Sequence, residues 1–119
     1  MADESYAKLM PYIDVQDGLK RVMGKKKMLL SLINRFDAQK MVGNLVEAIN
    51  QGDKTKIVET AHAVKGVAGN LGLTPLRDIM VDVETKAKAE EDCSGLIGEI
   101  NEILNKTQGA IAELMAMPE

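Results

Sequence analysis

The chain has 119 residues, of which 45% are hydrophobic and 28% charged, and its net charge is -3 at pH 7. These values are typical of one globular domain and exclude a disordered or collagen-like chain. The acidic balance disfavours nucleic acid as a partner, and no apolar run approaches the ~20 residues that cross a membrane.

The cysteine content and the first residues indicate the expected compartment. Cys93 is the single cysteine, so it cannot form an internal disulfide, which is typical of a reducing environment. Met1 is followed by Ala2, Asp3 and Glu4, which lack the positive charge that opens a secretory signal peptide. We therefore expect a cytoplasmic protein. Met1 and the ending at Glu119 suggest a free-standing chain, with a domain excised from a hybrid kinase as the alternative.

Apolar residues recur at spacings of three and four, which predicts helices along the whole chain. The first dozen residues are expected to add a turn or two, interrupted by Pro11. Short helices are then predicted at about 15–23 and about 25–36. Their inward positions are expected to be Val15, Leu19, Val22, Leu29, Leu32, Ile33 and Phe36.

Longer helices are predicted in the rest of the chain. Their approximate ranges are 38–50, 53–71, 75–90 and 95–116. The expected N-caps are Asp37, Asp53, Thr74 and Ser94. Because the loops are short, neighbouring helices should be antiparallel. The sequence predicts an all-α fold, an antiparallel up-down four-helix bundle over 38–116 with short N-terminal helices within 1–36, in a single domain of residues 1–119.

The expected core positions of these helices follow the same spacing. In the second of them, the apolar stripe consists of Ile57, Ala61, Val64, Ala68 and Leu71. In the last of them, it consists of Ile97, Ile100, Leu104, Thr107, Ile111 and Leu114, widened by Ile103 and Met115.

His62 is the one histidine of the chain and falls within the helix predicted at 53–71. At about 100° per residue, the apolar stripe of that helix is centred about 150° away, so the imidazole is expected to point into solvent. Lys65, Gly66 and Gly69 share its face. Each glycine costs about 1 kcal/mol relative to alanine inside a helix, and the missing side chains leave the imidazole open to a large partner.

Each of these features also has an ordinary explanation. A lone surface histidine most often has no function, a surface lysine is most often a solvated charge, and a glycine can permit close helix packing. The glycines lie on the wrong face for the core, however. The combination of an exposed imidazole, an ammonium group and an open surface favours a site that a large anionic group approaches.

The segment from Thr60 to Leu73, T-A-H-A-V-K-G-V-A-G-N-L-G-L, resembles the signature of histidine-containing phosphotransfer (HPt) domains, roughly A-H-x-L-K-G-x-x-x-x-L-G. Val64 stands where leucine is commoner. The similarity extends to Leu76 and Glu84 in the next predicted helix and to the segment 17–36. It therefore covers most of the chain.

This resemblance implies a carrier that accepts a phosphoryl group from an aspartyl phosphate of one receiver domain and passes it to another. It implies that His62 is phosphorylated on Nε2, that Lys65 screens the phosphoryl charge, and that Gly66 provides clearance. Glu84 could hold the Nδ1 proton, repel the phosphoryl group, or be an ordinary solvated helix charge. The chemistry agrees, because phosphoryl transfer depends mainly on positioning and charge stabilisation.

The resemblance also implies the partners, which are response-regulator receiver domains and a hybrid sensor kinase. Mg²⁺ is expected on the receiver, and no cofactor or metal on this chain, which should be a monomer. The docking surface is expected at Val58, Ala63, Gly69 and Leu73, with Val67 and, if the N-terminal segment lies alongside, Met10, Tyr12 and Ile13. The run Lys25–Lys27 could steer an acidic receiver or simply be a solvated helix start.

Other functions stay open at this point. A catalytically silent helical scaffold or adaptor would keep the fold without a reactive His62, and a chemotaxis-type kinase could phosphorylate such a histidine directly. A self-sufficient enzyme is not expected, because the sequence has no G-x-x-x-x-G-K phosphate loop and no second histidine. One histidine and one distant cysteine also do not suffice for zinc.

Overall fold

The computed structural model describes residue 9 and residues 11–117, and these residues form helices and connecting turns without a strand. The predicted all-α class is confirmed. The expected turns in the first dozen residues lie largely outside the described residues, as does Met10. Within the described part of the chain, no helix combines the length and the apolar character needed to cross a membrane.

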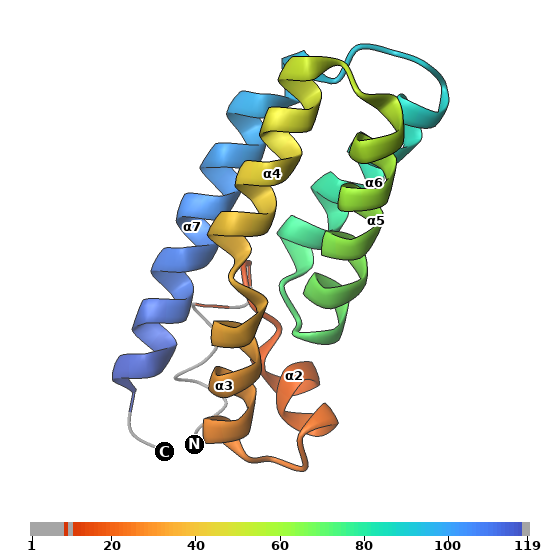
Figure 1. The fold of residues 1–119 in the computed structure, drawn as a ribbon. Helices are drawn as coiled ribbons and strands as arrows, with labels where there is room; N and C mark the ends of the chain where they lie inside the picture. Colours follow the sequence, from red (N-terminus) through yellow and green to blue (C-terminus); the bar gives the residue numbers. More distant parts are fainter. Residues whose placement is uncertain (1–8, 10, 118–119) are drawn as a thin grey trace.

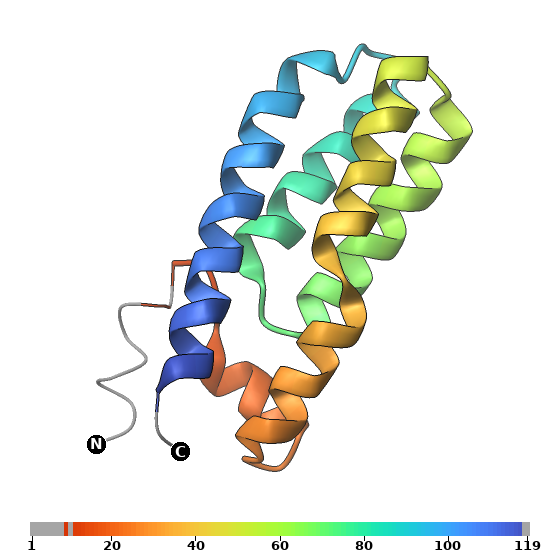
Figure 2. The ribbon, with the colours of Figure 1, turned by 60° about the vertical axis from the view of Figure 1, so that its left-hand side comes forward.

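Four long helices lie side by side and form the main body of the molecule (Figures 1 and 2). They are α4 (Ala38–Gln51), α5 (Lys54–Asn70), α6 (Thr74–Lys88) and α7 (Ile97–Ala116). Contacts join α4 to α5, α5 to α6, α6 to α7 and α7 back to α4, and the α5–α6 pair is the most closely packed. The candidate histidine therefore lies on one member of this pair.

Two of the four predicted N-caps are confirmed. The Asp37 side chain accepts a hydrogen bond from Lys40 N, and the Asp53 side chain accepts one from Lys56 N. These carboxylates satisfy free donors at the starts of α4 and α5.

The predicted N-caps Thr74 and Ser94 are wrong. The Thr74 hydroxyl donates to the carbonyl of Gly72, and Leu73 precedes the first residue of α6. Ser94 opens a short 3-10 turn, Ser94–Leu96, and its N–H and hydroxyl both donate to the Asp92 carboxylate. In both places the hydroxyl donates to an acceptor two residues earlier and therefore does not cap the α-helix.

The N-terminal helices are α2 (Val15–Arg21) and α3 (Lys26–Phe36). Asp37 separates α3 from α4 by a single residue, and it adopts a left-handed backbone conformation with φ of 48°. Figures 1 and 2 show α3 below α4 at the end of the molecule where the α5–α6 turn also lies.

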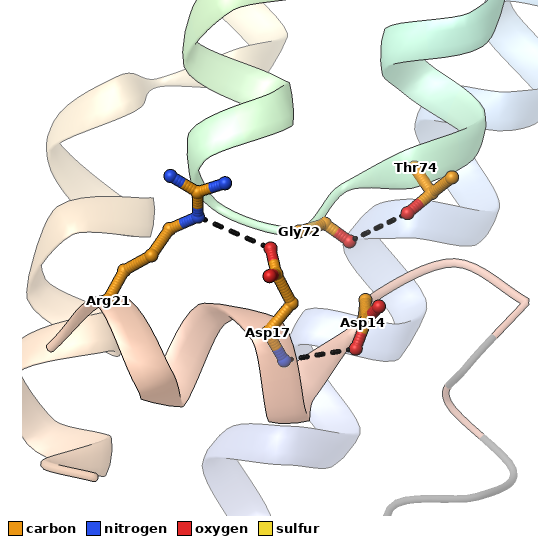
Figure 3. Close-up of polar contacts among 5 residues, drawn as sticks. All are labelled: Asp14, Asp17, Arg21, Gly72 and Thr74. Carbon is orange, nitrogen blue, oxygen red and sulfur yellow. Dashed lines mark hydrogen bonds and ion pairs between the residues drawn. The ribbon is translucent and has the colours of Figure 1, made fainter. Parts of the chain in front are cut away.

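The turn between α5 and α6 rests directly on the start of α2. Asp14 N donates to the carbonyl of Gly72 over 2.6 Å, and Gly72 has a φ of +76°. A Cβ on Gly72 would lie 2.5 Å from the Asp14 carbonyl oxygen, so this close approach requires glycine. Figure 3 shows this region, where the Asp14 carboxylate also caps α2 by accepting from Asp17 N and Arg21 pairs with Asp17. Gly72, a glycine of the signature segment Thr60 to Leu73, thus sets how the α5–α6 turn packs on α2.

The core largely follows the predicted apolar stripes, with differences at their edges. On α5 the predicted residues are buried, and on α7 the buried residues are Ile100, Leu104, Thr107, Ala110 and Leu114. Leu32 and Met115 were expected inward but are exposed. Each lies at the margin of its stripe.

Lys26 departs from the expectation that residues 25–27 form a solvated or steering run. Its side chain is buried, and its ammonium group donates to the main-chain carbonyl of Met117. Lys25 and Lys27 are exposed. The middle lysine therefore ties the start of α3 to the end of α7.

Candidate functional site

His62 lies in the middle of α5 on the face opposite to the core. The buried residues of this helix are Ile57, Ala61, Val64 and Ala68, whereas 70% of the His62 side chain is exposed. The prediction that the imidazole points into solvent is confirmed. A partner can reach this ring without any rearrangement of the core.

Glu84 of α6 faces His62 across the α5–α6 contact. Oε2 of Glu84 lies 3.5 Å from Nδ1 of His62, while only 8% of the Glu84 side chain is exposed. A carboxylate can only accept hydrogen bonds, so it favours the imidazole tautomer that carries the proton on Nδ1. That tautomer leaves the lone pair of Nε2 free on the solvent side.

Two lysines surround the Glu84 carboxylate. Lys65 Nζ donates to Oε1 over 2.8 Å, and Lys88 Nζ forms an ion pair with Oε2 at 3.0 Å. The hydrogen bond from Lys65 is the main cause that lowers the pKa of Glu84 to about 2, helped by Lys88 and opposed by burial. Glu84 is therefore ionised at neutral pH.

The sequence alone suggested a free Lys65 ammonium group beside the imidazole. In the structure, Glu84 holds this ammonium group. Sequence reasoning also missed Lys88. The signal for it was the spacing of four residues between Glu84 and Lys88, which places both on one face of a helix. This spacing alone does not indicate a functional residue, because such pairs are common on helix surfaces.

The two glycines of this face differ in their surroundings. A Cβ on Gly66 would meet no atom within 4 Å, so the surface one turn after His62 is open. A Cβ on Gly69 would lie 3.3 Å from Cδ of Arg77, whose side chain crosses α5 at this point. Gly69 was expected to give clearance to a partner, but the space above it is filled by Arg77.

The predicted docking residues are only partly at the surface. Ala63 is exposed, and Val58 and Val67 are half-buried next to His62. Leu73 is completely buried, so the prediction that it contacts a partner is wrong. The turn after α5 directs this side chain into the core, which the helical periodicity of α5 could not reveal. Ile13 is likewise buried, and Tyr12 is half-buried.

No group of three or more histidine, cysteine, aspartate or glutamate side chains suited to a metal ion occurs among the described residues. The site consists of the His62 imidazole, the buried Glu84 carboxylate and the ammonium groups of Lys65 and Lys88. Such a set suits an anionic group that approaches Nε2, because the carboxylate faces the other ring nitrogen and holds two cations in the same cluster.

A family model described as Hpt domain matches residues 35–110, which is more than half of the chain. The chain belongs to the Hpt domain family. Searches of curated proteins and of solved structures returned no match. Hpt domains take part in histidine phosphotransfer in phosphorelays, interact with receiver domains and act as phosphocarriers without kinase activity. The matched segment of this Hpt domain contains His62, Lys65, Gly66 and Glu84.

Proposed function

We propose that His62 accepts a phosphoryl group from the aspartyl phosphate of one receiver domain and passes it to the aspartate of another. The observation that carries this proposal is the exposed imidazole whose Nδ1 faces a buried, ionised carboxylate. This arrangement leaves Nε2 as the nucleophile on the accessible side of the ring.

The transfer step needs no general base, because no proton leaves the imidazole. The lone pair of Nε2 attacks phosphorus, the Nε2–P bond forms, and the bond between phosphorus and the aspartyl oxygen breaks, with its electron pair leaving on the carboxylate. Nδ1 keeps its proton, so the phosphorylated ring becomes cationic. Glu84 Oε2, 3.5 Å from Nδ1, stabilises that developing charge.

The neighbouring residues have separate roles in this proposal. Lys65 stabilises the negative charge of the transferring group, and Gly66 allows the receiver to approach closely. The docking surface includes Val58 and Ala63, with Gly69 beneath the Arg77 side chain. Mg²⁺ is supplied by the receiver, and this chain contributes no cofactor.

We infer that the chain forms one domain of residues 1–119. Its core is an antiparallel, up-down four-helix bundle, and the short N-terminal helices pack against one end. We infer that the protein acts as a cytoplasmic monomer, receiving its phosphoryl group from the receiver domain of a hybrid sensor kinase.

A transfer assay tests the proposal. The protein is mixed with a panel of prephosphorylated receiver domains and Mg²⁺, and the product is examined for acid-labile, base-stable label. We expect label on the wild-type chain and none on His62→Gln, which should keep its helical circular dichroism because His62 is exposed. Label that persists on His62→Gln would overturn the assignment, and a folded wild-type chain that accepts from no receiver would favour the silent scaffold.

A further inference from the structure

The carboxylate of Glu84 is shared among three partners. Oε1 accepts from Lys65, which projects from α5, whereas Oε2 is paired with Lys88 of α6 and also faces His62 Nδ1. The side chains of Lys65 and Lys88 are 30% and 62% exposed. One buried negative charge is thus neutralised by two cations from different helices.

Phosphorylation changes the charge balance of this cluster. Before transfer, two ammonium groups and one carboxylate carry a net charge of +1 beside a neutral imidazole. The phosphoryl group itself carries about -1.5 to -2 charges at neutral pH, while the ring that keeps its Nδ1 proton becomes cationic, so the net charge of the cluster changes by about -0.5 to -1. Lys65, one turn after His62 on the same helix, is the cation that the function proposed above pairs with it. If Lys65 turns toward the phosphoryl group, however, it leaves Glu84, and a buried carboxylate without a cation is strongly unfavourable.

We infer that Lys88 is a positioning residue that keeps Glu84 neutralised while Lys65 moves from Glu84 to the phosphoryl group on His62. This inference rests on the function proposed above. Lys88 lies on α6 one turn after Glu84, so their ion pair does not depend on the position of the Lys65 side chain. Lys88 acts through Glu84 and does not contact the reacting atoms.

The inference predicts that the effect of removing Lys88 depends on the charge of residue 84. We would phosphorylate the full chain with phosphoramidate, a small donor that needs no receiver. In that reaction the Nε2–P bond forms, the P–N bond breaks and ammonia leaves. The rate constant is measured by phosphorus NMR for the wild type, Lys88→Ala, Glu84→Gln and the double variant.

We expect Lys88→Ala to lower the rate constant about fivefold when residue 84 is glutamate. The loss should be less than twofold in the Glu84→Gln background, because a glutamine side chain has no charge to neutralise. Lys88→Arg should restore the rate. Lys106→Ala is the matched control, since Lys106 pairs with Glu102 at 2.8 Å on α7, away from His62. Its rate should equal that of the wild type, and thermal unfolding checks that all variants are folded.

Two results would overturn the inference. An equal loss in both backgrounds would mean that Lys88 acts on the phosphoryl group itself, and no loss in either would make it a bystander. Failure of the proposed function is a separate result, because then the wild type is not labelled on His62 at all.

Discussion

Gly66 leaves the helix surface open beside the exposed ring of His62. It lies inside α5, and a Cβ there would meet no atom within 4 Å. Gly66→Ala should therefore raise the free energy of unfolding by about 0.5–1 kcal/mol, because alanine is the better helix former. The same methyl group should slow transfer from a receiver domain about tenfold or more, because a misplacement of about 1 Å is costly in such reactions.

A small phosphoryl donor distinguishes this steric effect from a change in the reactivity of the imidazole. Phosphorylation of Gly66→Ala by phosphoramidate should stay within twofold of the wild type, since a small donor avoids the methyl group. Gly43→Ala is the matched control, because Gly43 is exposed inside α4 with no atom within 4 Å of a Cβ. It should gain similar stability with unchanged transfer, and an unimpaired Gly66→Ala would contradict a role in approach.

At the scale of single residues, the sequence could predict the properties that depend on one helix. The exposure of His62 follows from its angle to the apolar stripe of α5. The burial of Glu84 and its pairing with Lys65 depend on how α5 packs against α6, and no local pattern contains that information. The prediction for Leu73 was wrong for a similar reason, since this residue lies in the turn where helical periodicity ends.

Gly72 connects two elements, because the α5–α6 turn packs on the start of α2 through this residue. Gly72→Ala places a side chain at a φ of +76° and a Cβ 2.5 Å from the Asp14 carbonyl oxygen. We expect the free energy of unfolding to fall by about 2–4 kcal/mol, from the left-handed conformation together with the clash. Urea unfolding measures this loss.

Gly52→Ala serves as the control for backbone conformation alone. Gly52 ends α4 with a φ of +68°, and a Cβ there would meet no atom within 4 Å. Its loss should be about 1 kcal/mol. Equal losses at the two positions would show that α2 shifts away from the turn at no cost, and that the contact with Asp14 contributes little.

At the scale of elements, the predicted helices agree with the observed ones to within about two residues at most ends. Aspartate caps were predicted correctly because their geometry is local, as at Asp37 and Asp53. Thr74 and Ser94 were not, because each side chain is engaged by its preceding turn. The buried Lys26 was also unpredictable, since its partner, Met117, lies at the other end of the chain.

The stability of the whole molecule should depend on pH through Glu84. Its pKa is about 2 in the folded protein, against an ordinary value of 4.5, chiefly because Lys65 donates to it. Because the pKa is lower in the folded protein, ionised Glu84 adds to the free energy of unfolding. This stabilisation is complete above about pH 5 and is lost as the pH falls toward 2. Because Lys88 is largely exposed and solvent screens the pair, we expect the contribution to be about 1–2 kcal/mol.

Urea unfolding of the wild type and Glu84→Gln between pH 7 and pH 3 measures this contribution. Hydrogen bonds from Ser94 also lower the pKa of Asp92, and the Lys106 contact lowers that of Glu102, but both groups are present in the two proteins. The difference between the two unfolding free energies should shrink as the pH falls. A constant difference would contradict the lowered pKa of Glu84.

His62 projects from the face of α5 that lies opposite to the core. A standard protein interface covers about 800 Å² on each partner, so a protein that contacts His62 also covers the helix surface around it. If His62 is the phosphoryl carrier proposed above, two receivers that need this one imidazole cannot be bound to it at the same time, so donor and acceptor must take turns. In that case an excess of one unphosphorylated receiver should act as a competitive inhibitor of the other.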